Sequence, residues 1–158
     1  MYSKYLHRVL NIGIVVACVF LVTSLAQRYY IKRSSGRTIS VPGVEFSRSN
    51  KTLLLFLQQD CGACVESMPF YRQLVDTFQD SKNVRLVLIT PYQPEFANQF
   101  FEKEGLRFET VLQAKRGELG VKLSPTLILA DATGTVHGSW IGQLSPQQEI
   151  EIRTMLAN

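Results

Sequence analysis

The chain of 158 residues carries 17 basic and 13 acidic side chains, for a formal net charge of +4, and it contains three cysteines. Its length fits one domain with an appendage. Residues 1–35 hold five cations and no acid, so residues 36–158 have a net charge near −1. A folded domain that binds nucleic acid presents a basic face. The charge distribution therefore argues against nucleic acid as a partner.

An uncharged, apolar run over residues 9–26 predicts a transmembrane helix near the N-terminus. The run is at the short end for a helix that crosses a bilayer, which needs about 20 residues. Basic residues and tyrosines flank it and are typical of anchors at the membrane interface. We therefore predict a cytoplasmic N-terminus at residues 1–8, an uncleaved signal-anchor at residues 9–27 in contact with membrane lipid, and a basic juxtamembrane linker at residues 28–37 that meets anionic headgroups.

Other interpretations of this segment stay open. Thr23 to Ala26 offers a cleavage site for a signal peptide. Val15 to Ala17 resembles the motif before a lipidated cysteine, which would be Cys18, although the residues after it stay apolar. Charge does not settle the orientation either. Cations flank both sides, and the positive-inside rule by itself favours a cytoplasmic domain.

The rest of the chain, residues 38–158, predicts one α/β domain. Thr38 to Val41 is a candidate short strand, and the apolar run from Thr52 to Leu57 predicts a strand buried on both faces. Helical spacing of apolar residues follows from Gly62 to Gln79, and Val84 to Thr90 predicts a second buried strand. The strand–helix–strand order implies a right-handed crossover and parallel pairing.

The second half predicts a helix, a short strand, a hairpin and a final helix. Pro94 to Gly105 has proline near its start and glycine as a C-terminal stop. Phe108 to Leu112 fits a short strand, and the four-residue connection between Thr126–Ala130 and Thr135–Ile141 predicts an antiparallel hairpin. Ser145 is followed by Pro146 and Gln148, a capping pattern that opens a helix. The sum is a mixed sheet with helices on both faces.

Two cysteines lie two residues apart in Asp60-Cys61-Gly62-Ala63-Cys64, between the first buried strand and the helix. A strand that leads into Cys-x-x-Cys at the start of a helix is the signature of a thioredoxin-like redox site. Free N–H groups and the helix dipole favour a thiolate at Cys61. Cys64 lies one turn further on, close enough to form a disulfide. The carboxylate of Asp60 opposes thiolate formation, so the direction of the thiol pKa stays open.

A metal site or a structural disulfide are the alternatives for this cysteine pair. Zinc or an iron–sulfur cluster needs further ligands, and the chain offers only Cys18, His7 and His137. A structural disulfide across so small a loop gains little stability from chain entropy. We predict no metal and no cofactor.

The chain resembles the thioredoxin superfamily, and more narrowly its membrane-anchored TlpA-like thiol–disulfide oxidoreductases, over roughly residues 50–157. Besides the cysteine motif, the resemblance rests on Pro69, five residues after Cys64, and on Ser124-Pro125-Thr126, which resembles the cis-proline segment of the family. The glycine and serine before the last helix also resemble the family ending. The resemblance implies a thioredoxin-like fold, a mixed central sheet flanked by helices, with an extra helix between Pro91 and Gly117.

The resemblance also implies roles. Cys61 would be the attacking thiol and Cys64 the more buried resolving thiol. Pro125 would be cis and would place the backbone of Ser124 beside Cys61, where an extended client pairs, with Thr126 at the start of the strand. An ordinary trans proline at a strand start is the alternative. The supporting residues would be Gly62, Ala63, Glu66 and Pro69.

The sequence departs from the family near the resolving thiol. Leu55 stands where thioredoxins carry a buried acid, and Ser67 stands where many TlpA-like proteins carry a glutamate. Glu66 is one place off. The acceptor for the proton of Cys64 therefore stays open among Glu66, Gln58 and water. Trp140 is predicted to lie in the core and His137 at the surface.

The leading hypothesis is an oxidoreductase at the cell inner membrane whose domain faces the periplasm. It would reduce disulfides of client proteins and be reduced again by a membrane thiol electron donor. The alternatives are a disulfide oxidant, a peroxide-reducing relative and a non-catalytic module that binds a partner around Pro125. The peroxide chemistry needs a threonine before the cysteine that the sequence lacks.

Overall fold

The computed structural model describes residues 13–19, 21–22, 36–115 and 117–158. The chain forms two compact units, residues 1–33 and residues 34–158. In the first unit, residues 13–19 and 21–22 are helical and their side chains are exposed. Among the described residues, none of the helices has the length and apolar character needed to cross a membrane. The predicted N-terminus at residues 1–8, much of the predicted anchor at residues 9–27 and most of the predicted linker at residues 28–37 lie outside the described residues.

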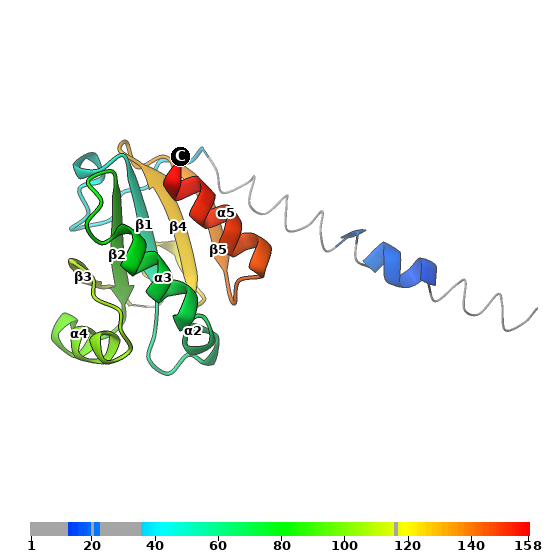
Figure 1. Ribbon diagram of the computed structural model, residues 1–158, viewed down its shortest axis with the longest axis horizontal. Coiled ribbons are helices and arrows are strands. Elements are labelled where there is room, and N and C mark those ends of the chain that lie inside the picture. The colour runs from blue at the N-terminus through cyan, green and yellow to red at the C-terminus, as the bar shows by residue number, and fades with distance from the viewer. Residues whose placement is uncertain (1–12, 20, 23–35, 116) are drawn as a thin grey trace, which may run out of the picture. The chain divides into compact units, whose positions relative to one another are not determined.

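A five-stranded mixed sheet forms the centre of the second unit (Figure 1). Its order is β3-β2-β1-β4-β5, where β1, β2 and β3 run parallel and β4 and β5 run antiparallel to their neighbours. This arrangement confirms the predicted parallel crossover and hairpin. The strands are β1 (Lys51–Phe56), β2 (Val84–Thr90), β3 (Thr110–Gln113), β4 (Thr126–Asp131) and β5 (Val136–Ile141).

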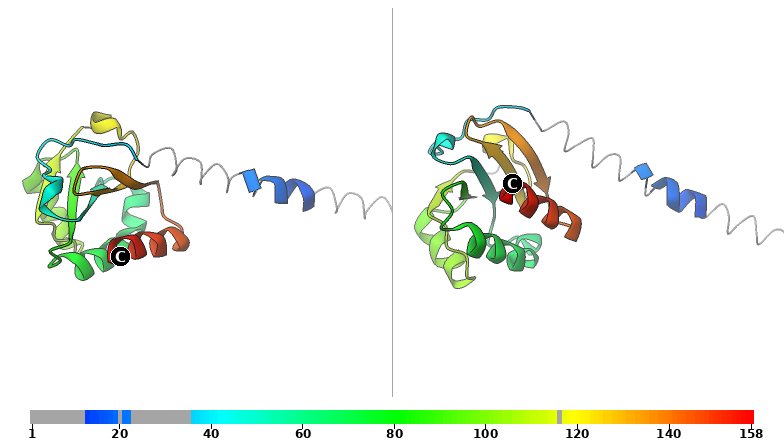
Figure 2. Two further views of the ribbon diagram at one scale, coloured as in Figure 1. Left: turned by 90° about the horizontal axis from the view of Figure 1, so that it is seen from above. Right: turned by 45° about the horizontal axis from the view of Figure 1, so that its top comes forward.

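The α-helices of this unit pack against one face of the sheet (Figure 2). Extended chain and two short 3-10 helices cover the other face through residues such as Val41, Phe46 and Leu119. The predicted mixed sheet flanked by helices is confirmed, although the α-helices all lie on one face and only the two 3-10 helices lie on the other. The helices are α2 (Gly62–Glu66), α3 (Met68–Phe78), α4 (Pro94–Lys103), α5 (Pro146–Ala157), η1 (Phe46–Arg48) and η2 (Glu118–Gly120).

The central strand β1 explains the apolar run in the sequence. Leu53 and Leu55 face the core under the α-helices, and Leu54 and Phe56 face the second core. Side chains of a strand alternate between faces, and both faces are covered here, so nearly every position is apolar. The residues of this strand that lead into the redox motif, Leu53 to Phe56, are all apolar.

The predicted helix over residues 62–79 is two helices, α2 and α3, that meet at Ser67. Pro69 lies in the first turn of α3. A proline has no N–H and its ring collides with the carbonyl four residues earlier, so an uninterrupted helix is disfavoured at this point. The break makes α2 a short helix that begins directly after Cys61 and contains Cys64.

Residues 36–39 attach the start of the domain to the β4–β5 turn. Gly36 N–H donates to the Val136 carbonyl at 2.7 Å, and Ile39 N–H donates to the Gly134 carbonyl at 2.9 Å. The expected strand at Thr38–Val41 is wrong, since Thr38 forms only an isolated bridge. Gly134 has φ +79°, and a Cβ there would lie 2.6 Å from the Ile39 carbonyl oxygen. The chain therefore enters at the sheet end remote from the cysteine motif.

Candidate redox site

Cys61 and Cys64 form a disulfide at the start of α2. Cys61 is the N-cap residue of this helix, and its sulfur accepts a hydrogen bond from the Cys64 N–H at 3.1 Å. Cys61 is half-buried, whereas Cys64 is 0 % exposed and belongs to the core under the helices. One sulfur is therefore accessible to a partner, and the other is reached only through it.

The segment before β4 lies directly against the accessible sulfur. The Ser124–Pro125 peptide bond is cis, as the sequence resemblance predicts. The Ser124 carbonyl oxygen lies 3.4 Å from Cys61 Sγ. Thr126 Oγ1 donates to the Leu123 carbonyl at 2.7 Å, and Gly142 N–H donates to the Pro125 carbonyl at 2.8 Å. These bonds tie the segment to β4 and to the end of β5, so the Ser124 backbone is held beside Cys61.

Three exposed apolar residues adjoin this junction in the sequence or across the sheet. Val65 follows Cys64, Leu123 precedes Ser124, and Ile141 pairs with Thr126 across β4 and β5. Their exposed fractions are 49 %, 62 % and 40 %. We call these three residues the apolar rim. Exposed apolar groups that gather at one place on a soluble domain mark a binding surface.

The surroundings of Cys64 lack a buried carboxylate. Leu55 is fully buried in the core, and no Asp or Glu is buried among the described residues. Ser67 donates its hydroxyl to the Ala63 carbonyl at 2.8 Å. Burial raises the pKa of Tyr71 to about 12, so its phenol stays protonated at neutral pH. Glu66 is exposed on α2 and Gln58 is half-buried, so the proton acceptor for Cys64 stays open among Glu66, Gln58 and water.

The other predicted supporting residues lie on α2 and α3. Gly62 is exposed, Ala63 is half-buried, and Pro69 is exposed in the first turn of α3. Trp140 lies in the core, as predicted, and its indole N–H donates to Glu151 Oε2 at 3.2 Å.

One contact of the site was not foreseen. The Tyr92 hydroxyl donates to Asp60 Oδ1 at 2.5 Å. This hydrogen bond is the main reason why the pKa of Tyr92 is raised. Tyr92 follows β2, and the parallel pairing of β1 with β2 brings its loop beside the cysteine motif. The sequence predicted the parallel pairing of β1 with β2, and this pairing indicates that residues after Thr90 lie near the cysteine motif.

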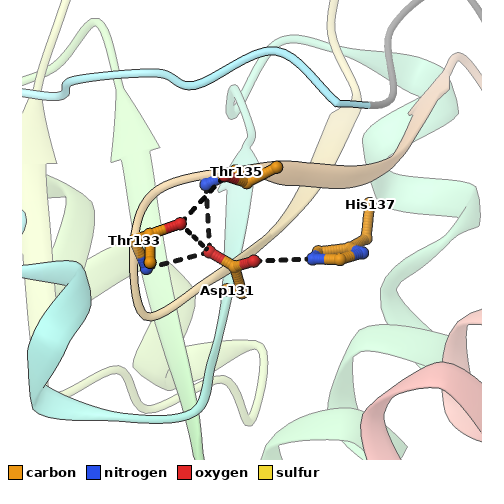
Figure 3. A network of polar contacts seen from close by, with 4 residues as sticks. All are labelled: Asp131, Thr133, Thr135 and His137. Carbon is orange, nitrogen blue, oxygen red and sulfur yellow. Dashed lines mark hydrogen bonds and ion pairs between the residues drawn. The ribbon is translucent and has the colours of Figure 1, made fainter.

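His137 lies at the far end of the sheet, in the hairpin network of Figure 3. Its Nε2 is 2.8 Å from Asp131 Oδ2. Asp131 Oδ1 accepts hydrogen bonds from the N–H and hydroxyl of Thr133 and from the Thr135 N–H. The Thr133 hydroxyl is the largest of the causes that lower the pKa of Asp131. Within the described part of the chain, no group of three or more His, Cys, Asp or Glu could hold a metal ion.

A mixed five-stranded sheet, a Cys-x-x-Cys disulfide that caps a helix and a cis-proline beside it together define a thioredoxin-like domain. The family model described as Redoxin matches residues 40–155. The chain therefore belongs to the redoxin family. Family membership and the paired cysteines support thiol–disulfide oxidoreductase activity.

Solved structures share the fold at low sequence identity. A Chlorobium tepidum chain assigned as the thiol:disulfide interchange protein DsbE is 21% identical, with a TM-score of 0.60, and the match covers 78% of this chain and 94% of that one. A thiol-disulfide isomerase from Corynebacterium glutamicum is 18% identical, with a TM-score of 0.56 and coverage of 78% and 90%. StoA from Bacillus subtilis is 23% identical, with a TM-score of 0.53 and coverage of 75% and 91%. A comparison with curated proteins found no match.

Proposed function

We propose that this protein is a membrane-tethered thiol–disulfide oxidoreductase that reduces disulfides of extracytoplasmic client proteins through Cys61 and Cys64. One observation carries the proposal. The half-buried sulfur of Cys61 lies in the apolar rim beside the cis-proline, and the fully buried sulfur of Cys64 lies behind it. This asymmetry suits an attacking thiol in front of a resolving thiol.

The reaction begins with both cysteines reduced. The Cys61 thiolate attacks one sulfur of the client disulfide, the client S–S bond breaks, and the departing client thiolate takes a proton from water. Cys64 then gives its proton to a base or to water and attacks Cys61 Sγ in the mixed disulfide. The bond from Cys61 to the client sulfur breaks as the Cys61–Cys64 bond forms, and the second client sulfur leaves as a thiolate that takes a proton from water, so two electrons pass from the protein to the client. A membrane thiol electron donor would supply two electrons to reduce Cys61–Cys64 again.

The client would bind as an extended segment across the apolar rim. Thr126 begins a strand of the sheet, and the bend that precedes it, with the cis Ser124–Pro125 bond, holds the Ser124 backbone beside Cys61. A segment that lies along Ser124 would bring its own cysteine to the attacking sulfur, while its side chains contact Val65, Leu123 and Ile141. The solved relatives described as interchange and isomerase proteins support disulfide exchange of this kind and leave its direction to experiment.

The tether would be the apolar segment at residues 9–27. Its described helical part exposes Ile14, Val15 and Val16, which are more than half exposed. Such side chains are stable in lipid and costly in water. The chain enters the domain at the sheet end remote from the disulfide. An extracytoplasmic, periplasmic location suits a disulfide-exchange protein, since disulfides persist in oxidising compartments.

The direction of the reaction is tested by the reduction potential of the full chain in detergent, equilibrated against dithiothreitol or glutathione with the thiols counted. A value near that of thioredoxin, about −270 mV, or lower supports a reductase. A value near that of DsbA, about −120 mV, would make the protein an oxidant. If no reversible Cys61–Cys64 disulfide forms, the protein is a binding module and the proposal is wrong.

The tether and its orientation are tested by membrane fractionation and protease protection. The full chain should remain with membranes after alkaline extraction, and the domain should be digested only from the periplasmic side. A matched chain that starts at residue 36 should be soluble. Digestion from the cytoplasmic side would overturn the proposed location, and release by alkali would overturn the tether.

A further inference from the structure

A hydrogen bond connects the residue before Cys61 to the loop after the neighbouring strand. Asp60 directly precedes Cys61, and Tyr92 lies two residues beyond the end of β2. The Tyr92 hydroxyl donates to Asp60 Oδ1 at 2.5 Å. Both loops leave the carboxyl ends of parallel strands, where Phe56 lies opposite Ile89. The contact is therefore built into the sheet, although the two residues are 32 positions apart.

The carboxylate of Asp60 matters because of where it stands in the chain. A negative charge beside a thiol makes the thiolate more costly to form. A phenol that donates to the carboxylate turns the positive end of its O–H dipole toward that charge, and 2.5 Å is at the short end for a bond from a hydroxyl to a carboxylate. The bond also directs Oδ1 toward the β2–α4 loop. The raised pKa of Tyr92 fits a phenol whose proton is held by the Asp60 carboxylate.

We propose that Tyr92 is a positioning residue of the redox site, which holds the Asp60 carboxylate by a hydrogen bond and so limits its repulsion of the Cys61 thiolate. The proposal rests on the proposed function, in which Cys61 is the attacking thiol. Tyr92 itself does not touch the reacting sulfurs. Its effect passes through Asp60, and this dependence can be measured.

Other groups also act on Cys61. The Cys64 N–H donates to the Cys61 sulfur and favours the Cys61 thiolate. The Ser124 carbonyl oxygen, 3.4 Å from the Cys61 sulfur, disfavours that thiolate. The charged side chains on the adjoining segments are Glu66 in α2, Glu95 in the first turn of α4, and Lys115, Glu118 and Lys122 on the loop before Ser124. These groups stay unchanged in the variants below, so differences among the variants report on Asp60 and Tyr92.

The test is the pH dependence of Cys61 alkylation in the reduced full chain in detergent. Iodoacetamide is the probe. Cys61 and Cys64 share one tryptic peptide, apart from Cys18, and fragment ions of that peptide locate the label on Cys61 or Cys64. Tyr92→Phe should raise the midpoint pH, so that alkylation below the midpoint slows roughly threefold, which is about half a pKa unit. Asp60→Asn, which removes the charge and keeps an acceptor for Tyr92, should lower the midpoint.

The decisive comparison is Tyr92→Phe in the Asp60→Ala background, where neither charge nor acceptor remains. The proposal expects no further shift there, because coupled residues are not additive. An equal shift in both backgrounds, a shift in the opposite direction, or no shift in the native background would overturn it. Thermal unfolding of each variant separates a local electrostatic effect from loss of folding. Alkylation is read without any client, so the proposed function can fail in the potential measurement while this inference stands, and the reverse also holds.

Discussion

The two ends of the β4–β5 pair are organised in opposite ways. At the hairpin end, Asp131 receives hydrogen bonds from Thr133 and Thr135 and contacts His137, all within six residues of it. At the redox end, Cys61 meets Ser124 across 63 positions of sequence. The hairpin end satisfies the polar side chains of its turn locally, although its backbone also bonds to residues 36–39. The redox end is assembled from distant segments.

The two ends also differ in what they leave unsatisfied. The redox end exposes the apolar rim, and in the adjoining first helical turn of α3 the buried Tyr71 hydroxyl lacks a hydrogen-bond partner among the described residues. The hairpin end places its polar side chains in contact with each other (Figure 3). Surfaces that bind partners leave groups exposed for those partners, whereas a turn that only closes a hairpin does not need exposed binding groups. The comparison predicts that changes at the redox end alter chemistry and binding, and that changes at the hairpin end alter stability.

The largest effect should come from the cysteines. Cys61→Ser should abolish client reduction, because no thiolate remains to attack. Cys64→Ser should stop turnover at the first step and accumulate mixed disulfides through Cys61, since the resolving thiol is missing. Non-reducing gels and mass spectrometry of trapped complexes measure both. Mixed disulfides that accumulate through Cys64 in Cys61→Ser, and not through Cys61 in Cys64→Ser, would show that the roles of the two cysteines are reversed.

The apolar rim should give the next largest effect. Leu123→Asp places a charge on the rim beside Ser124 and should raise the KM for a protein client about tenfold, which corresponds to about 1.4 kcal/mol of binding. Reaction of the disulfide with dithiothreitol should be unchanged, because that small reductant needs no extended contact. Ile150→Asp is the matched control, since Ile150 is 57 % exposed on α5 outside the rim. Equal effects of the two changes would count against the rim as the client surface.

The difference between local and distant contacts also explains which features of the structure could be predicted from the sequence. The cysteine motif after a buried strand, the capping box at Ser145 and Gln148, and the hairpin around Gly134 are local patterns, and the structure contains each of them. Their residues are close in sequence, so spacing and residue type are sufficient to identify them. The cis bond before Pro125 came from resemblance to a family rather than from a local rule.

Contacts between distant segments were the part that could not be predicted. The bond from Tyr92 to Asp60 depends on the register of β1 with β2 and on the course of two loops. The sequence predicts a helical turn over residues 114–120, where η2 lies, but that η1 and η2 cover the second sheet face depends on tertiary packing. The break at Ser67 is different, because Pro69 already signals it two residues later.

The hairpin end should respond in stability alone. Asp131→Asn should lower Tm by a few degrees at pH 7 and leave client reduction unchanged. The hydrogen bonds and His137 lower the pKa of Asp131 in the folded state, so its contribution is present above the ordinary carboxyl pKa and is lost as pH falls through the lowered folded value. The difference in Tm between native protein and variant should therefore shrink in acid, below about pH 4. Thermal unfolding at several pH values measures it, and a difference that persists unchanged at pH 2 would contradict the assignment.

The smallest effect at neutral pH should come from Tyr71→Phe, which removes the buried hydroxyl at the redox end. No hydrogen bond to the described residues is lost, so the free energy of unfolding at pH 7 should change by less than about 1 kcal/mol. In alkali, the variant should be the more stable of the two proteins. Burial raises the pKa of Tyr71 from 10.0 to about 12, so the folded state keeps a proton that the unfolded chain loses, and native stability falls as pH rises between these values. The variant lacks this group and should be more stable than the native protein at pH 11, as denaturant unfolding would measure. If both proteins unfold alike at pH 11, burial does not hold Tyr71 in the protonated state. The Tyr71 hydroxyl would then no longer support the contrast between a hairpin end whose polar side chains are hydrogen-bonded and a redox end with an unpaired buried hydroxyl.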